Sequence, residues 1–395
     1  MTVSTAVKWA VSSMTGAPTL NGTAGSMIAV LDAFLVNGFG TKAVDSATVT
    51  DGICRMAITG ASAAQDHCVI QLAGATGDGV ALNGPQRVKA ATASYVEFAC
   101  DLPDGPLTGT ITFKIAPLGW EKVFSKTNVA VYRSADVSGT RAYYRVDDTN
   151  ALYARVTMYE SMSDVDTGVG LGPLATVLPG GYFWHKRSAA SATGVYWALL
   201  GDSRGIHICV APNASSTPLT SGGYGCYVHY MGDPNSYRSG DAWSAMLTGA
   251  TTASYTDLSG CIFSSTVAAK CLQRMSSGVG GAVQVARNTW GGVPVSGNDP
   301  SQGVYPSRTD NGLRLAPIVI GDGAMNLYGP RGQLPGAYHC AQTNVISAFG
   351  SDAKITEGHG AFSNSLLLSI GCGNLAGAAP GCGFFEVPLT KSWRG

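Results

Sequence analysis

Short runs of alternating apolar and polar residues recur along the chain and predict a protein built mainly of β-strands. In the first third, clusters of Gly, Asp, Asn and Pro separate these runs, as turns separate strands. The runs cover 53–59, 68–73, 86–91, 95–100 and 109–115. Five strands in so short a stretch predict a small barrel or sandwich of their own.

A second strand pattern begins at Trp120 and is rich in Tyr, Val and Trp. Its expected strands are 129–133, 141–146, 152–159, 195–200, 206–210 and 226–230, with a closing set at 313–320, 344–348, 365–370 and 383–388. Segments rich in Gly, Ser and Thr at 213–223 and 275–303 predict long surface loops.

One segment has helical periodicity. Residues 27–36 place Ile28, Leu31 and Leu35 on one face, Ser26 is the expected cap, and Asn37-Gly38 is the expected end.

The fold class expected from these patterns is mainly β, with several small β-sandwich or barrel modules and one short N-terminal helix. We expect an N-terminal segment with the helix at 1–45 and a small β-barrel or sandwich at 46–117. Residues 118–395 are expected to form a larger β-sandwich part with long Gly/Ser loops.

The charge content narrows the classes of function. The chain has 395 residues, 25 basic and 25 acidic side chains, and 13% charged residues, against roughly 25% in ordinary soluble domains. Without net positive charge, the chain is not expected to bind nucleic acid by electrostatics. Its low charge favours a surface covered by other protein subunits, because interface cores are depleted in charged residues. The longest apolar segment, 27–36, contains Asp32, so no membrane span is expected, and the N-terminus has no apolar stretch of signal-peptide length.

The ten cysteines include no C-x-x-C pair, and they are expected to be buried free thiols. An even number also permits disulfides, and whether Cys372 and Cys382 lie close together stays open. The six histidines are scattered, without the spacing of a zinc site, so no metal or cofactor is expected.

Residues Gly201–Gly205 match the G-x-S-x-G motif, in which Ser203 would be a nucleophile. That motif requires a helix after the serine, whereas the residues that follow alternate like a strand. We therefore interpret the motif as a hairpin turn, and we expect no catalytic residues and no enzymatic activity.

Two acidic clusters, Asp147-Asp148 and Asp164 with Asp166, have oxygen ligands of the kind that calcium prefers. They lack the further ligands of a calcium-binding loop, so loop capping by the short side chains is the favoured interpretation. The glycine strings at 168–172 and 278–281 lack the strand-and-helix setting of a dinucleotide site.

Aromatic residues gather at 182–185, 196–197 and 224–230. Such clusters either bind sugars or another protein surface, or pack in the core of a β-sandwich. Tyr182 and Trp184 are therefore candidate interface residues.

Several strings together resemble virion structural proteins of tailed bacteriophages. They lie at 22–40, 81–88, 119–134, 144–148, 231–242 and 329–336, with Trp393-Arg394 at the end. The resemblance implies a non-enzymatic building block of the phage particle, assembled in the host bacterial cytoplasm and located in the virion. It would form a homo-oligomer in the tail or baseplate and contact other virion proteins.

Alternatives remain at this point. One is a decoration or cement protein on the capsid exterior, and another is a tail-tip protein that binds a host receptor or glycan through an exposed aromatic patch. An enzyme that attacks the cell envelope is a third.

The polar turn at 231–242 supplies the remaining candidates. Asp233, Arg238 and Asp241 are expected to bridge strands or subunits through charge-assisted hydrogen bonds. On this hypothesis, Asp241→Ala weakens assembly without unfolding the monomer.

Overall fold

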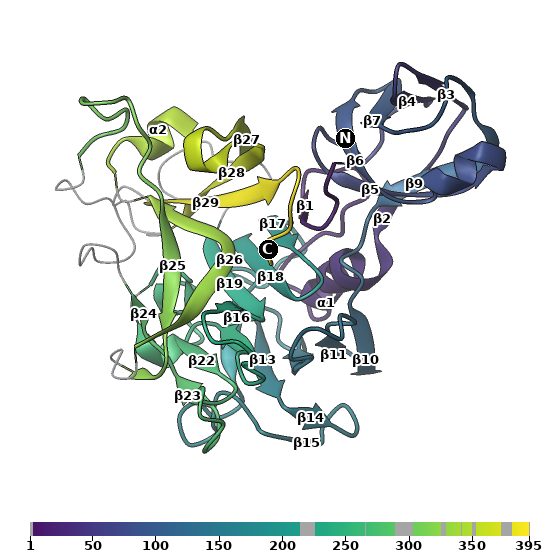
Figure 1. Cartoon of the computed structure of the whole chain (residues 1–395). Coiled ribbons are helices and arrows are strands. Elements are labelled where there is room, and N and C mark those ends of the chain that lie inside the picture. Colours follow the sequence, from purple (N-terminus) through teal and green to yellow (C-terminus); the bar gives the residue numbers. More distant parts are fainter. Residues whose placement is uncertain are drawn as a thin grey trace.

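The computed structural model describes residues 3–213, 226–264, 266–288, 303–324, 329–340, 342–349, 353–372 and 381–394. These residues form several antiparallel sheets and few helical turns, which confirms the mainly β fold class (Figure 1). None of the helices in the described ranges is long and apolar enough to cross a membrane. Of the expected loops, 214–223 and 289–302 lie outside the described residues, and so does Tyr224.

An eight-stranded sheet forms a lobe at one side of the molecule (Figure 1). Its strand order is β2-β9-β5-β6-β7-β4-β3-β8. The strands are β2 (Phe39–Ala43), β3 (Ser46–Thr50), β4 (Ile53–Ala57), β5 (Val69–Thr76), β6 (Gly84–Ala91), β7 (Tyr95–Ala99), β8 (Gly105–Pro106) and β9 (Thr108–Ile115), with the 3-10 helix η2 (Gly77–Leu82) after β5. Buried and exposed residues alternate along β3, as expected of a sheet with one face in the core.

A five-stranded sheet follows, in the order β10-β11-β12-β13-β16. Its strands are β10 (Glu121–Lys126), β11 (Val129–Arg133), β12 (Tyr143–Asp147), β13 (Tyr153–Tyr159) and β16 (Tyr182–His185). Between the last two lies a short hairpin of β14 (Ser161–Met162) and β15 (Gly168–Val169).

The central sheet has the order β1-β17-β18-β19-β21-β22-β23. It consists of β1 (Lys8–Val11), β17 (Tyr196–Gly201), β18 (Gly205–Ala211), β19 (Tyr227–Gly232), β21 (Met246–Thr248), β22 (Lys270–Leu272) and β23 (Val283–Gln284), with the 3-10 helices η3 (Leu258–Gly260) and η4 (Val267–Ala269) in its connections. Every residue of β17, β18 and β19 is buried, so both faces of these strands are covered.

The last sheet has the order β24-β25-β26-β29-β28-β27, and β20 (Asn235–Ser236) also pairs with β26. Its strands are β24 (Arg287–Asn288), β25 (Ala316–Gly321), β26 (Pro330–Cys340), β27 (Lys354–Glu357), β28 (Ser365–Cys372) and β29 (Gly381–Pro388), with the 3-10 helix η8 (Gly360–Phe362). The strand expected at 344–348 is wrong, because this segment is helix α2 (Val345–Phe349). Phe349 of this helix packs edge-on against Phe384 of β29, with ring centroids 5.2 Å apart.

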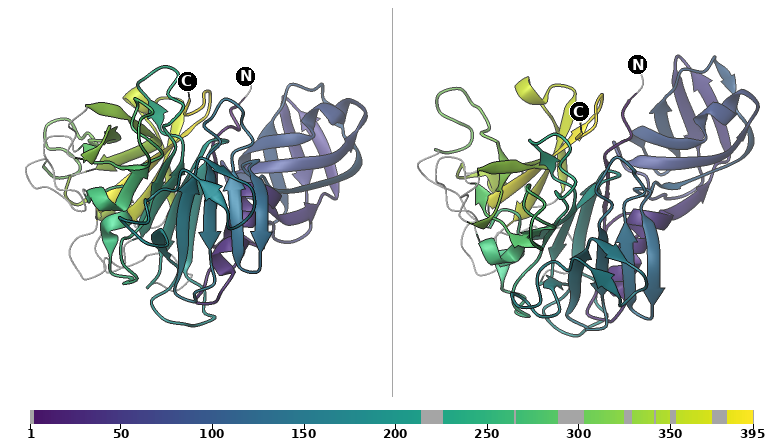
Figure 2. Two further views of the ribbon diagram at one scale, coloured as in Figure 1. Left: turned by 90° about the horizontal axis from the view of Figure 1, so that it is seen from below. Right: turned by 60° about the horizontal axis from the view of Figure 1, so that its bottom comes forward.

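Two histidines on neighbouring strands show what covers each face of the central sheet. His207 of β18 packs against Phe385 of the last sheet, with ring centroids 5.0 Å apart. His229 of β19 stacks on Trp184 of the five-stranded sheet at 5.9 Å. The central sheet therefore lies between the other two, and Figure 2 shows the eight-stranded lobe beyond them.

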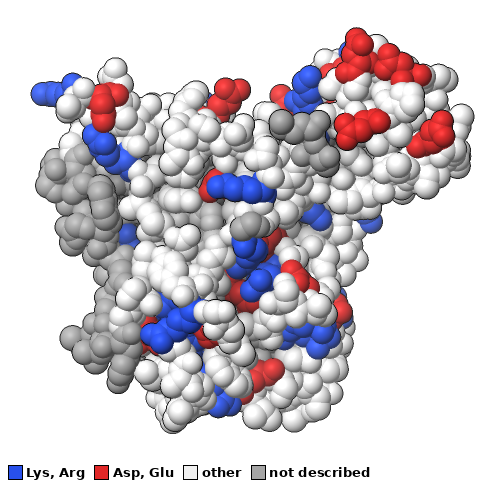
Figure 3. All heavy atoms as spheres, viewed as in Figure 1, with Lys and Arg blue, Asp and Glu red and all other residues white. Residues whose placement is uncertain are grey.

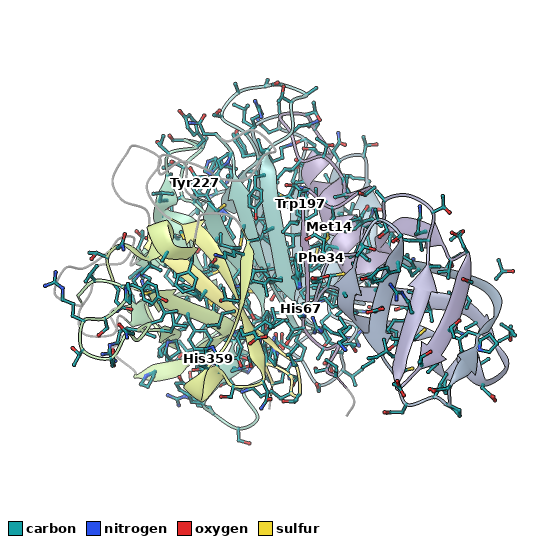
Figure 4. All side chains as sticks on the ribbon, turned by 90° about the horizontal axis from the view of Figure 1, so that it is seen from above. Met14, Phe34, His67, Trp197, Tyr227 and His359 are labelled. Carbon is teal, nitrogen blue, oxygen red and sulfur yellow. The ribbon has the colours of Figure 1, made fainter. Side chains whose placement is uncertain are left out.

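The N-terminal segment expected at 1–45 is shared between two sheets. Strand β1 pairs with β17 of the central sheet, and β2 pairs with β9 of the eight-stranded lobe. Trp197 of β17 lies near Met14 and Phe34 of this segment (Figure 4), and all three belong to one continuous apolar core.

The expected helix is present as α1 (Ser26–Leu31) followed by a π-helical turn, η1 (Asp32–Asn37). It ends at Asn37, as predicted, before Gly38 with a φ of 70°. The cap differs from the prediction. The Asp148 carboxylate accepts hydrogen bonds from the Met27 and Ile28 amides at 2.7 and 3.3 Å, whereas the Ser26 hydroxyl donates to backbone carbonyls.

Eight cysteines are described and all are free thiols; all but Cys100 are buried. The side chains of Cys372 and Cys382 lie outside the described part of the structure. The prediction of buried free thiols is therefore confirmed for the described cysteines other than Cys100.

Candidate functional site

A polar groove lies where the N-terminal segment, the C-terminal residues and the sheets meet; we call it the junction groove. Its larger part encloses about 700 Å³ and an adjoining part about 370 Å³. Ser138, Arg204 and Arg394 line both parts, so the two parts adjoin. Figure 3 shows basic and acidic side chains gathered side by side near the centre of the face that it draws.

The turn between β17 and β18 forms one wall of the groove and contains Ser203. The Asp202 carboxylate accepts hydrogen bonds from the amides of Arg204 and Gly205, each at 2.8 Å, and this fixes the turn. Strands β17 and β18 pair on either side of it, so the prediction of a hairpin turn is confirmed.

Ser203 has a carboxylate, not a histidine, as the hydrogen-bond partner of its hydroxyl. Its hydroxyl donates to Asp136 Oδ2 at 2.8 Å, and no histidine is among the described residues that line the groove. Hydrogen bonds from Ser138 hold the pKa of Asp136 below its usual range. A carboxylate of lowered pKa is a weak base, so Asp136 orients Ser203 rather than deprotonating it.

Arg394 joins the C-terminal end of the described chain to this turn. Its Nε and Nη2 atoms lie 2.7 and 2.9 Å from the two oxygens of Asp202, which is a bidentate pair. Its Nη1 atom donates to Asn235 Oδ1 at 3.1 Å and to the backbone carbonyl of Asp233. The guanidinium is thereby held in one orientation at the groove.

Asp233 links the turn to the loop before β12. One carboxylate oxygen accepts from the Thr140 amide at 2.8 Å and from Nε and Nη2 of Arg204, each at 3.3 Å. The Thr140 hydroxyl donates to the other oxygen. Asp233 thus bridges separate elements of the chain through charge-assisted hydrogen bonds.

Beneath the groove, Arg331 pairs with two carboxylates. Its Nη2 atom lies 2.7 Å from Asp241 Oδ1, its Nε atom bonds to the other Asp241 oxygen, and its Nη1 atom lies 2.6 Å from Asp322 Oδ1. Arg238 reaches Asp322 from the surface at 3.7 Å. Hydrogen bonds from Arg331 and Ser236 outweigh desolvation and hold the pKa of Asp241 below its usual range.

The structure therefore brings Asp233, Arg238 and Asp241 together at the junction groove. It does not bring Tyr182 and Trp184 there, because both are buried in the core between the five-stranded and central sheets. Their polar atoms donate to the carbonyls of Ala268 at 3.1 Å and Thr248 at 2.7 Å. The prediction that Tyr182 and Trp184 are interface residues is therefore wrong, because neither side chain reaches the surface of the chain.

Four residues were not predicted from the sequence: Asp136, Arg204 and Arg394, which line the groove, and Arg331, which lies beneath it. The G-x-S-x-G turn was a usable signal for Arg204, because the side chains of such a turn cluster at one end of a hairpin. Asp136, Arg331 and Arg394 come from segments far apart along the chain, and no local pattern joins them.

The acidic clusters have structural partners. Asp164 Oδ1 accepts from the amides of Asp166 and Thr167 at 2.8 and 2.9 Å, which is the predicted loop capping. Asp166 pairs with Lys126 and Arg145. Within the described ranges, no group of three or more His, Cys, Asp or Glu side chains is arranged to hold a metal ion.

A second surface feature is apolar. The end of β15 and two neighbouring loops carry four of the seven exposed large hydrophobic residues described, and we call this set the valine loops: Val169 (68% exposed), Leu174 (38%), Val177 (45%) and Val279 (74%). A methyl group placed on Gly281 would lie 3.5 Å from Leu174 Cδ2, so the two loops are in contact. Large exposed apolar side chains on adjoining segments mark sites of protein association.

No protein-family model and no curated protein matches the chain.

Proposed function

We propose that the chain is a non-enzymatic structural subunit that associates with copies of itself and with other proteins of a particle. The valine loops are the observation that carries this proposal. Burying apolar side chains stabilises association by roughly 25 cal/mol per Å² of apolar surface, and no folded neighbour in the described chain covers these four.

The particle we propose is a tailed bacteriophage, with the subunit in the tail or baseplate. This part rests on the resemblance of strings such as 119–134 and 231–242 to virion structural proteins. The eight described cysteines, all free, agree with assembly in a reducing cytoplasm, where disulfides are rare.

The non-enzymatic part rests on the groove. Its carboxylates are held as hydrogen-bond acceptors by arginines, amides and hydroxyls, and the Ser203 hydroxyl donates to Asp136, a carboxylate of lowered pKa. A turnover assay against cell-envelope substrates, with Ser203→Ala as the reference, tests this part. Hydrolysis by the wild type that Ser203→Ala abolishes would contradict it.

Self-association is tested by sedimentation of the wild type and of Val279→Asp over a range of concentrations. We expect the wild type to form a defined oligomer and Val279→Asp to shift it toward monomer, because a carboxylate is costly to bury in an apolar contact. Val80→Asp is the matched control, since Val80 is 56% exposed on the eight-stranded lobe, away from the valine loops. A wild type that stays monomeric, or equal effects of both variants, would count against the proposal.

The location is tested by labelling. Antibody-labelled protein imaged on intact phage particles distinguishes tail or baseplate from the capsid exterior. Label on the capsid would contradict the tail assignment, and a particle without label would contradict the virion assignment.

A further inference from the structure

We propose that the junction groove is a binding site for an uncharged saccharide. This site is separate from the valine loops, and the inference is independent of the proposed structural role. It rests on the charge balance of the groove, on the direction of its hydrogen bonds and on one exposed aromatic ring.

The charges at the groove balance. Five basic side chains line it or pair with residues that line it, and five carboxylates do the same. They are Lys8, Arg204, Arg238, Arg331 and Arg394, against Asp136, Asp202, Asp233, Asp241 and Asp322. A groove whose charges are paired with one another attracts a phosphate, a sulfate or a cation less than a groove with a net charge does.

The hydroxyl groups of the groove are arranged as acceptors. Ser138 and Ser203 donate their protons to Asp136 at 2.6 and 2.8 Å, and Ser236 donates to Asp241 at 2.8 Å. The Thr140 hydroxyl donates in the same way to Asp233. Each oxygen is left with lone pairs, so this wall can accept hydrogen bonds from a ligand.

Because these groups accept hydrogen bonds, they favour a sugar, which has hydroxyl protons to donate, over an anion that has none. A fully ionised phosphate or sulfate has no protons to donate and cannot use a wall of acceptors. A saccharide hydroxyl both donates and accepts, so it can donate to a serine oxygen and accept from a guanidinium N–H. Arg204 suits the second role, because it is partly exposed at the centre of the groove and its bonds to Asp233 are long, at 3.3 Å.

An exposed aromatic residue lies between two groove residues in the sequence. Tyr237 is 54% exposed and lies between Ser236 and Arg238, which both line the larger part. Its hydroxyl hydrogen-bonds to Gln333 at 3.4 Å, which restrains the ring. The face of a tyrosine ring packs well against the flat C–H face of a sugar, because both are apolar in the middle and polar at the edge.

The groove is also rigid before any ligand binds. Asp202 and Asp233 are almost fully buried, and each is fixed by several hydrogen bonds from different segments. A site whose polar groups are already oriented loses little conformational entropy on binding.

Gly240 offers a way to block the groove without disturbing the fold. It lines the larger part, its φ is +71°, and a Cβ added there would meet nothing within 4 Å. Asn tolerates this left-handed conformation, so Gly240→Asn places a side chain into the groove. Gly303→Asn is the matched control, since Gly303 has a φ of +80°, equally open space, and lies outside the groove.

The test is binding of the labelled full chain to an array of neutral oligosaccharides and their sulfated counterparts, followed by calorimetry with the best neutral probe. We expect binding to a neutral oligosaccharide that Gly240→Asn abolishes and Gly303→Asn retains. Tyr237→Ala should weaken it roughly tenfold, while Tyr237→Phe stays within about twofold.

Three outcomes would overturn the inference: no neutral probe bound at millimolar concentration, binding confined to the sulfated probes, or neutral binding that survives Gly240→Asn. A monomeric chain that binds a neutral saccharide would contradict the structural role and leave the groove assignment standing.

Discussion

The Asp241 carboxylate and the Arg331 guanidinium form an ion pair in which both side chains are almost fully buried, with 2% and 1% exposed. Arg331 also pairs with the equally buried Asp322. This position changes the effect expected of a mutation. The sequence alone predicted that Asp241→Ala weakens assembly without unfolding the monomer, whereas the structure places Asp241 inside the monomer.

Asp241→Ala should therefore destabilise the folded chain by about 3–5 kcal/mol, because it leaves Arg331 buried beside one carboxylate in place of two. Urea denaturation of the purified monomer measures this. Arg238→Ala is the control, since Arg238 is 47% exposed and lies 3.7 Å from Asp322, and its loss should cost less than about 1 kcal/mol. Equal stability of Asp241→Ala and the wild type would mean that the pair is not formed in solution.

The pair of Asp148 and Lys186 gives a second prediction. Both side chains are completely buried, and the same carboxylate caps helix α1 through the Met27 amide. Asp148→Asn should cost about 3 kcal/mol or more, because the charge of Lys186 then lacks its partner. The double variant Asp148→Asn/Lys186→Met should recover part of the loss. If it is less stable than Asp148→Asn alone, the unpaired charge is not the cause.

Stability should depend on pH through four buried histidines. Burial lowers the pKa of His185 and His207 to about 4, and that of His229 and His339 to about 3, from an ordinary 6.5. Because the unfolded chain binds these protons more readily, the free energy of unfolding should fall as the pH drops from about 6.5 toward 4. Each histidine contributes at most about 1.4 kcal/mol per pH unit.

Urea midpoints at pH 7.5 and 5 measure this effect. Asp241 and Asp257, whose pKa values are lowered, lose their contribution only below about pH 4, so they leave this window unchanged. His207→Asn should reduce the difference between the two midpoints. Equal wild-type midpoints would contradict the assignment of these histidines as neutral core residues.

Thiol reactivity should differ sharply among the described cysteines. Burial raises the pKa of Cys54, Cys68 and Cys271 to about 12, and that of Cys340 to about 11. Because the thiolate is the reactive form, these four should resist alkylation in the folded protein at pH 8. Cys100, which is half-buried, should react first. Peptide mapping after brief treatment with iodoacetamide checks the order, and urea-unfolded protein is the control. Alkylation of Cys271 as fast as that of Cys100 would show the central sheet to be open.

Strand β4 was predicted, and it alternates because water is on one side of its sheet. Strand β3 alternates as clearly but was missed, because it is a short run of small residues and threonines. The fully buried strands β17, β18 and β19 were predicted from their continuous apolar and aromatic runs. Segment 344–348 could not be assigned in this way. A short apolar run has no decisive period, and its helical form depends on the contact of Phe349 with Phe384 in a distant strand.

The site was predictable only in part. The polar turn around Asp233 and Asp241 stood out because its charges are rare in a chain of low charge. Their partners Arg204 and Arg331 did not, since the pairing depends on which strands meet in three dimensions. The aromatic run at Tyr182 and Trp184 was misleading, because aromatic residue types are typical both of binding sites and of a core. Here every residue of the strand is buried, so the run belongs to the core.

The pairing of β1 with β17 bears on how the chain folds during its synthesis. Lys8 lies opposite Gly201, so the edge strand of the central sheet leaves the ribosome long before the strand that it must join. Until then its apolar residues, Trp9 and Val11 among them, lack their final partners. A chain rich in such long-range pairings folds slowly and exposes unpaired strand edges meanwhile. Yield in cells should therefore respond to translation speed and chaperone supply more strongly than the stability of the finished protein would indicate.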